Sequence, residues 1–151
     1  MVEVNIRDVQ VSDRKQLNEI RLLIANQGKH SLAPIATDED LECYSTEEDY
    51  EFLVGVDEGR VLGYIEMRFY DGDKMIMELF VHPQFSRKGI GDQLIIELIT
   101  NVREKKKYSE IYLQVKKANE VIKLYERNGF RKTTRKVTDG YEMVHKIKVP
   151  V

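Results

Sequence analysis

One stretch of this chain decides how it folds, namely Val81-His82-Pro83-Gln84-Phe85-Ser86-Arg87-Lys88-Gly89-Ile90-Gly91-Asp92. An apolar strand ends at Pro83, and a basic loop with two glycines then leads into a segment whose apolar residues recur at three- and four-residue spacing. The residues of this apolar stripe are Leu94, Ile95, Leu98, Ile99 and Val102. The stretch therefore predicts a strand, a loop and a helix in that order.

The loop is suited to bind an anion. The N–H groups in the first turn of a helix have no intrahelical partner, and the peptide dipoles leave partial positive charge there. Gly89 and Gly91 lack a Cβ, so a diphosphate can approach the backbone closely, and Arg87 and Lys88 add positive charge beside it. A glycine-rich turn that only connects two elements explains the same residues.

Two well-known phosphate loops are excluded by spacing. The chain has no G-x-x-x-x-G-K-[ST] motif, and it has no G-x-G-x-x-G motif because Leu94 lies three residues after Gly91. A different nucleotide-like ligand is the remaining candidate.

Length and composition bound the remaining choices. The 151 residues, 42% apolar and 33% charged, predict one globular domain over 1–151. A net charge of −2 argues against a nucleic-acid partner. There is no apolar run long enough to cross a bilayer and no signal peptide core, so a cytoplasmic location without membrane contact is expected. With Cys43 as the one cysteine and three histidines, an intramolecular disulfide is excluded and a metal site is not expected.

The hydrophobic pattern predicts strands and helices that alternate along the chain. Strands are expected at 2–9, 52–56, 61–70, 75–82, 111–115, 130–137 and 141–149. Helices are expected to begin near Ser12, near Thr37, after the glycine loop and near Asn119. The least defined pattern is that of residues 28–50.

A second motif follows the predicted strand at 111–115. It reads Leu113-Gln114-Val115-Lys116-Lys117-Ala118-Asn119 and then Leu124-Tyr125-Glu126-Arg127-Asn128-Gly129-Phe130. Together with the glycine loop it resembles the GNAT superfamily of acetyl-CoA-dependent N-acyltransferases, over about Val54 to Phe130. The resemblance implies an α/β (α+β) fold, in which about four helices flank a mixed, mostly antiparallel central sheet of six to seven strands.

The resemblance also implies a site for acetyl-CoA. The family loop Arg/Gln-x-x-G-x-G/A holds the pyrophosphate of coenzyme A, and this chain departs from it in carrying Ser86 where Gln or Arg is usual. Ser86 contributes either a hydroxyl contact or nothing. The strand that ends at Val81 resembles the family strand whose main chain pairs with pantetheine. Asn119 resembles the family asparagine that contacts the cofactor, and it also suits an ordinary N-cap. The cofactor contacts implied are Leu79, Phe80, Val81, Ser86, Arg87, Lys88, Gly89, Ile90, Gly91, Asp92, Asn119 and Tyr125.

The implied reaction is direct transfer of an acetyl group from a thioester to an amine. It requires a neutral amine, stabilisation of the developing oxyanion and a proton for the departing thiolate. The main-chain N–H near Val81 is the family's candidate for the second task. Tyr125 is the candidate proton donor, because a phenol remains protonated at neutral pH. A core aromatic on an amphipathic helix is its alternative role.

The general base is less obvious. Some relatives that acetylate protein N-termini use a Glu at the position of Gln114, whose amide is not a useful proton acceptor. Glu78 is the leading candidate in its place, since strand alternation puts Glu78, Phe80 and His82 on one face. A salt-bridged or solvent-facing residue is the alternative for Glu78. His82 titrates in the right range for a base, but its place beside Pro83 favours a structural role.

The amine acceptor stays open. Acidic residues gather between Asp38 and Asp49, where the family often builds its acceptor site, and this would suit a cationic amine. A solvated helix face explains these charges equally well. Two readings without catalysis also stay open: an acyl-CoA-binding sensor or regulatory module, and a structural or dimerisation domain. The strand at 141–149 is the candidate for pairing two copies into a homodimer.

Overall fold

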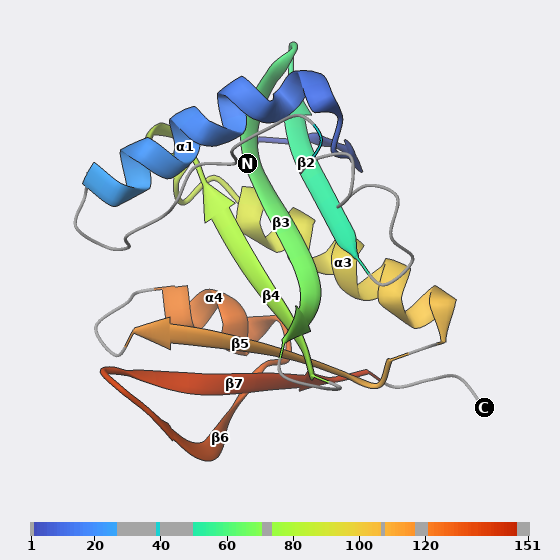
Figure 1. Cartoon of the computed structure of the whole chain (residues 1–151), viewed down its shortest axis with the longest axis vertical. Helices are drawn as coiled ribbons and strands as arrows, with labels where there is room; N and C mark the ends of the chain where they lie inside the picture. The colour runs from blue at the N-terminus through green and yellow to red at the C-terminus, as the bar shows by residue number, and fades with distance from the viewer. Residues whose placement is uncertain are drawn as a thin grey trace.

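The computed structural model describes residues 2–26, 39, 50–70, 74–106, 108–116 and 121–147. Seven strands of this described part form one sheet in the order β1-β2-β3-β4-β5-β7-β6 (Figure 1). Their bounds are β1 Asn5–Asp8, β2 Glu51–Asp57, β3 Arg60–Tyr70, β4 Lys74–Val81, β5 Glu110–Lys116, β6 Arg131–Val137 and β7 Gly140–Lys146. All neighbours are antiparallel except β4 and β5, which are parallel. The expected mixed, mostly antiparallel sheet is confirmed.

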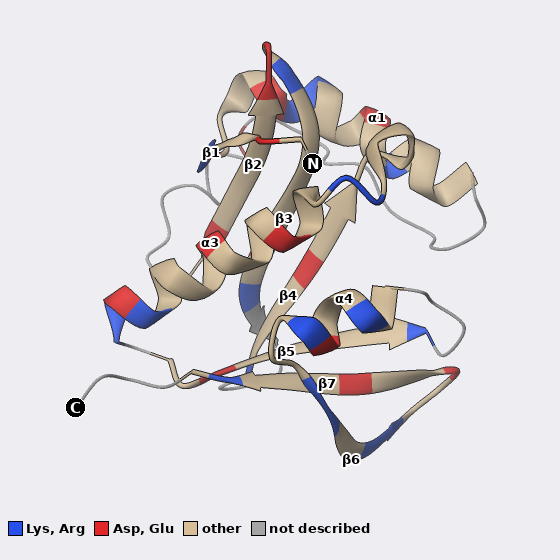
Figure 2. Cartoon of the chain, turned by 180° about the vertical axis from the view of Figure 1, so that it is seen from behind, with Lys and Arg blue, Asp and Glu red and all other residues tan. Residues whose placement is uncertain are grey.

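Helices cover both faces of the sheet. α1 (Arg14–Asn26) lies on one face, whereas α3 (Ile90–Lys105) and α4 (Val121–Arg127) lie on the other (Figures 1 and 2). About four helices were expected and three are described, because the helix expected near Thr37 falls outside the described residues. None of these three combines the length and the apolar character that a membrane crossing demands.

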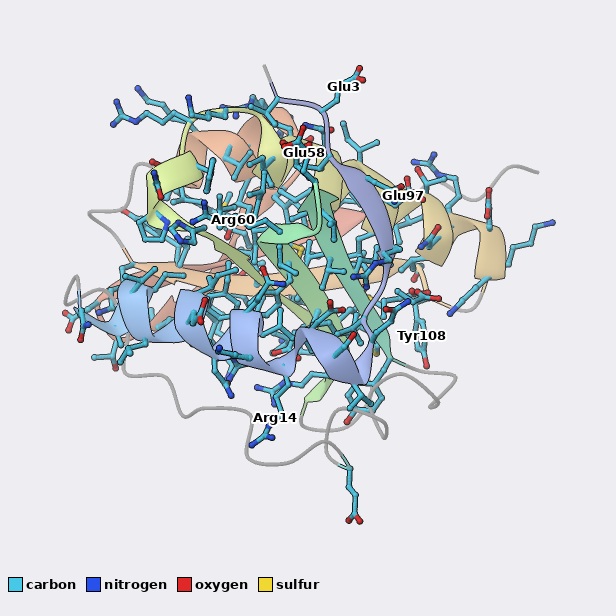
Figure 3. All side chains as sticks on the ribbon, turned by 90° about the horizontal axis from the view of Figure 1, so that it is seen from above. Glu3, Arg14, Glu58, Arg60, Glu97 and Tyr108 are labelled. Atoms are coloured by element: carbon cyan, nitrogen blue, oxygen red, sulfur yellow. The ribbon has the colours of Figure 1, made fainter. Side chains whose placement is uncertain are left out.

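Two hydrophobic clusters hold the layers together. On the α1 face, Leu17 and Ile20 of the helix pack with Tyr64 and Phe80 of the sheet. On the other face, the apolar stripe of α3 expected from the sequence is buried against the strands. Figure 3 shows side chains filling the layer between α1 and the sheet, while the labelled Arg14 points away from it. Both faces of the sheet are therefore covered where β2, β3 and β4 run.

The β2–β3 hairpin turns where the sequence predicts it. Its two central residues, Glu58 and Gly59, have positive φ angles of 49° and 77°. This pair of angles suits the twist of adjacent strands, and glycine adopts it at little cost. β3 in turn pairs along the whole of β4, from Tyr70↔Lys74 to Gly63↔Val81.

β4 and β5 pair in register at one position and then diverge. Within these two fully described strands, one residue pair is in register, Ile76↔Tyr112. Beyond it the strands separate, as Figure 1 shows, so β4 continues through Glu78–Val81 without a ladder to β5. We call the diverging main chains of Glu78–Val81 and Leu113–Lys116 the wedge. Its β4 side offers main-chain groups that the sheet does not use.

Candidate active site

The glycine loop lies between the end of β4 and the start of α3. Arg87 and Gly89 both have positive φ, 61° and 82°, which bends the chain sharply before the helix begins. The first hydrogen bond of the helix runs from the Gln93 N–H to the Gly89 carbonyl, at 3.2 Å. The N–H groups of Ile90 and Gly91 precede that bond at the positive end of the helix dipole. Figure 2 shows the basic stretch that leads into α3.

Ser86 uses its hydroxyl inside the loop. The Oγ donates to the Pro83 carbonyl at 3.0 Å, next to a short 3-10 turn at Pro83–Phe85. The sequence leaves the role of this hydroxyl open, and in the structure it stabilises the turn. The exposed side chains of Arg87 and Lys88 remain as the basic groups beside the backbone.

Gly91 and Asp92 face α4. Gly91 is buried, and a Cβ built on it would lie 3.0 Å from the Leu124 Cδ2. The Asp92 carboxylate accepts from Arg127 Nε at 2.9 Å and Nη2 at 2.7 Å, and from Asn128 Nδ2 at 2.8 Å. These bonds, those from Arg127 first, hold the pKa of Asp92 below its usual value. The first turn of α3 is thus fastened to the end of α4.

Tyr125 is buried on α4, with 8% of its surface exposed. Its ring packs edge-on against Phe130, with the centroids 5.9 Å apart. Burial raises the pKa of the phenol, and the charge of Glu78 raises it further. Tyr125 is therefore protonated at neutral pH and lies close enough to Glu78 to respond to its charge. Asn119, expected just before this helix, lies outside the described residues.

Glu78 lies on β4 at the edge of the wedge. Its side chain is 37% exposed, and Oε1 lies 3.4 Å from Arg68 Nη2. Its neighbours Leu79 and Phe80 pack into the clusters on opposite faces of the sheet. Gln114, the position where some relatives carry a base, is exposed on β5. Glu78 and Gln114 are the two strand positions considered for the general base, and only Glu78 carries a carboxylate.

Glu66 is a carboxylate of this site that the sequence reading missed. It lies directly opposite Glu78 in the β3–β4 register and is 4% exposed. Burial and the neighbouring Glu78 raise its pKa. A signal for it exists in the sequence, because Glu66 and Glu78 are equally far from Gly72, the centre of the predicted turn between their strands.

Arg21 of α1 completes the polar group around Glu66. Its Nη2 lies 3.7 Å from Glu66 Oε1, and its Nε donates to the Tyr64 hydroxyl at 2.6 Å. The guanidinium also lies over the rings of Tyr64 and Phe80, 5.8 and 5.7 Å from their centroids. The buried carboxylate therefore has a partly buried cation nearby.

His82 has the structural role that its position predicts. Its Nδ1 accepts from the Gln84 N–H at 3.1 Å and so caps the 3-10 turn before the loop. Partial burial, followed by the charge of Arg60, lowers its pKa. Across the described residues, His, Cys, Asp and Glu form no cluster of three or more that could hold a metal ion.

Comparisons with known proteins agree with this arrangement. Residues 20–147 match the model of the acetyltransferase (GNAT) domain family. A spermidine N(1)-acetyltransferase of Thermoplasma acidophilum is 25% identical over 161 residues, covering 95% of this chain and 96% of the relative.

Two solved structures share the fold. A GNAT-family acetyltransferase of Streptococcus pneumoniae superposes with a TM-score of 0.82 at 17% identity, covering 96% of this chain and all of that one. The yncA protein of Salmonella typhimurium, a putative acetyltransferase solved with acetyl-CoA, gives 0.79 at 23% identity, with coverage of 97% and 95%. The resemblance seen in the glycine loop and the tyrosine motif is confirmed: this chain belongs to the GNAT acetyltransferase family and is an N-acetyltransferase.

Proposed function

We propose that this chain transfers the acetyl group of acetyl-CoA to a primary amine, with the reacting atoms in the wedge between β4 and β5. The observation that carries the proposal is the divergence of β4 from β5 beyond Ile76↔Tyr112, with the half-exposed carboxylate of Glu78 on the diverging part of β4. Tyr125 of α4 is the phenol that the family resemblance assigns to the same reaction. A carboxylate can make the amine neutral by accepting its proton, and a protonated phenol can supply a hydrogen to the departing thiolate.

The residues present suit the cofactor. Positive φ at Arg87 and Gly89 turns the chain so that the start of α3 and two basic side chains border the loop, where a pyrophosphate would bind. The unladdered main chain of Glu78–Val81 would pair with the amides of pantetheine, as an added strand does. The bound thioester would supply the activated acetyl group.

Each residue then has one task. Glu78 takes the proton of the incoming ammonium, so that the nitrogen lone pair becomes available. A main-chain N–H near Val81 stabilises the negative charge that develops on the carbonyl oxygen. Tyr125 donates a hydrogen bond to the departing sulfur, and the second proton that the nitrogen loses as the amide forms leaves with that sulfur as the free thiol. Because burial raises the pKa of the phenol, it acts more easily as a hydrogen-bond donor than as a complete proton donor.

The test is thiol release from acetyl-CoA across a panel of amines. Glu78→Gln should lower kcat/KM at neutral pH by about 100-fold, and Tyr125→Phe should lower kcat by about 10-fold or more. Glu51→Gln is the matched control, because Glu51 is a buried strand carboxylate paired with Lys105 at 2.5 Å. If the wild type bound acetyl-CoA tightly but acetylated none of the amines, the result would contradict the proposal and favour an acyl-CoA-binding sensor.

A polyamine is the acceptor that we place first in the panel. The support is the name of the Thermoplasma acidophilum relative, which aligns with nearly the whole chain. Spermidine and spermine should outperform an N-terminal peptide amine and an amino acid. The acidic stretch from Asp38 to Asp49 lies outside the described residues, apart from Glu39, whose side chain is exposed. Equal rates on all amines would remove the polyamine assignment and leave the transfer itself intact.

A further inference from the structure

Two carboxylates face each other across neighbouring strands beside the wedge. Glu66 and Glu78 are directly opposite in the antiparallel ladder, so their side chains share the α1 face of the sheet. Side chains in such pairs begin about 5 Å apart. Glu66 is 4% exposed, whereas the Glu78 side chain is 37% exposed. One carboxylate is thus enclosed, and the other reaches solvent.

The charged groups around the pair come from α1, β3 and β4. Arg68 lies beside Glu78, 3.4 Å away, and Arg21 lies 3.7 Å from Glu66. Arg21 commits its Nε to the Tyr64 hydroxyl. From β2, the residue opposite Glu66 is Phe52, which carries no charge. Glu66 therefore has a carboxylate on one side and an aromatic ring on the other, and the charges of Arg21 and Arg68 lie within reach of it.

Two carboxylates that face each other across neighbouring strands disfavour each other's ionised form. Like charges side by side raise the pKa of one member, and burial adds to the effect because it disfavours the charged form. Burial, the charge of Glu78 and a hydrogen bond to Glu78 all raise the pKa of Glu66, against the effect of the two arginines. The proton then belongs to the pair rather than to either residue.

We propose that Glu66 is a positioning residue that shares one proton with Glu78, so that the facing pair, rather than Glu78 alone, receives and holds the proton taken from the ammonium. The inference rests on the function proposed above. When the pair carries no proton, the ammonium N–H bond breaks, an O–H bond forms on Glu78, and that proton is held by a hydrogen bond to Glu66. It leaves to water through Glu78, the exposed member, before the next turnover.

The first test needs no catalysis. The full chain with carboxyl-labelled glutamate is titrated by NMR without substrate, as wild type, Glu66→Gln, Glu78→Gln and Glu51→Gln. In Glu78→Gln, the midpoint of Glu66 should move at least about one pH unit lower, because the neighbouring negative charge is removed. Glu66→Gln should abolish that titration, which assigns the midpoint to Glu66. Glu51→Gln should leave the midpoint of Glu66 unchanged. An unchanged Glu66 midpoint in Glu78→Gln would overturn the proposal.

The second test asks whether the shared proton matters for the reaction. The acid limb of kcat/KM, measured with the same amine throughout, should move about one pH unit lower in Glu66→Gln and stay in place in Glu51→Gln. A purely structural Glu66 would lower stability in urea and leave the limb where it is. If NMR showed that Glu66 and Glu78 are coupled but the acid limb of kcat/KM did not move in Glu66→Gln, the positioning role would be refuted. Absence of turnover in wild type would count against the proposed function and leave the NMR result standing.

Discussion

Gly91 of α3 and Leu124 of α4 are in contact at a point where no side chain fits between them. A Cβ at Gly91 would lie 3.0 Å from the Leu124 Cδ2 and 3.3 Å from the Leu79 Cδ2. Three elements therefore meet at one backbone position: the helix after the glycine loop, the tyrosine helix and strand β4. The distance from the loop to Tyr125 is set by this packing as well as by the loop itself.

Gly91→Ala tests that contact. The added methyl group must displace Leu124 or Leu79, and overpacking of this kind costs about 1–3 kcal/mol. We expect the free energy of unfolding in urea to fall by that amount. Affinity for coenzyme A, measured by calorimetry, should fall as well, because α3 and α4 are pushed apart.

Two variants separate packing from backbone conformation. Leu124→Ala added to Gly91→Ala should recover part of the lost stability, since the methyl group then has room. Leu124→Ala added to Gly89→Ala should recover nothing, because Gly89 needs its left-handed φ of 82° rather than space. If the changes in the free energy of unfolding caused by Gly91→Ala and Leu124→Ala were fully additive, the two positions would not be in steric contact.

Asp92→Asn should make the stability of the protein depend less on acid pH. Hydrogen bonds from Arg127 lower the pKa of Asp92 in the folded state, so its contribution is present above the unfolded value of about 3.9 and is lost as pH falls through the folded value. At pH 7 the variant should lose less than about 1 kcal/mol, because Arg127 is 59% exposed and water screens the pair. Urea melts at pH 7 and near pH 2.5 measure the difference, which should shrink at the lower pH. An equal loss at both pH values would mean that the ion pair is not its source.

Local patterns predicted the elements but not all of the contacts between them. The glycine loop, α3 and the tyrosine helix each have a signal within a few residues, and each is where the sequence places it. The sequence predicts that Gly91 lets the cofactor approach the backbone, and the structure shows that its missing Cβ also makes room for Leu124. That contact joins residues far apart in the chain, so no local spacing reports it.

The buried carboxylate is the clearest omission. Glu66 matters because of its register with Glu78 and the approach of Arg21 from α1. The register could be counted from the turn between the strands, since both glutamates are equally far from Gly72. The approach of Arg21 could not, because it depends on how α1 crosses the sheet. The sequence therefore predicts the pairing of Glu66 with Glu78 across β3 and β4, but it does not predict the contact that α1 makes with them.

Tyr125→Phe should separate catalysis from stability. Burial raises the pKa of the phenol, so wild type should show no alkaline loss of kcat from this residue up to about pH 10. The variant should keep the shape of the pH profile and the free energy of unfolding within about 0.5 kcal/mol, while kcat falls about 10-fold or more. The pH dependence of kcat and urea melts measure the two effects. A fall in stability large enough to explain the lost activity would return Tyr125 to the role of a core aromatic.

Tyr64→Phe should change the titration of the carboxylate pair without touching either carboxylate. The Tyr64 hydroxyl accepts from Arg21 Nε at 2.6 Å and holds the guanidinium 3.7 Å from Glu66. Without that acceptor, the guanidinium of Arg21 should shift toward Glu66, and an opposite charge at closer range favours the ionised carboxylate. The midpoint of Glu66 in the NMR titration should therefore move to lower pH, and stability should fall by about 1 kcal/mol for the lost buried hydrogen bond. Tyr141→Phe, which removes a phenol of β7 on the opposite face of the sheet, is the control and should leave the midpoint unchanged. A midpoint that rises in Tyr64→Phe would mean that Arg21 moves away from Glu66 when the hydroxyl is lost, and the tyrosine would then be the group that holds the cation at the site.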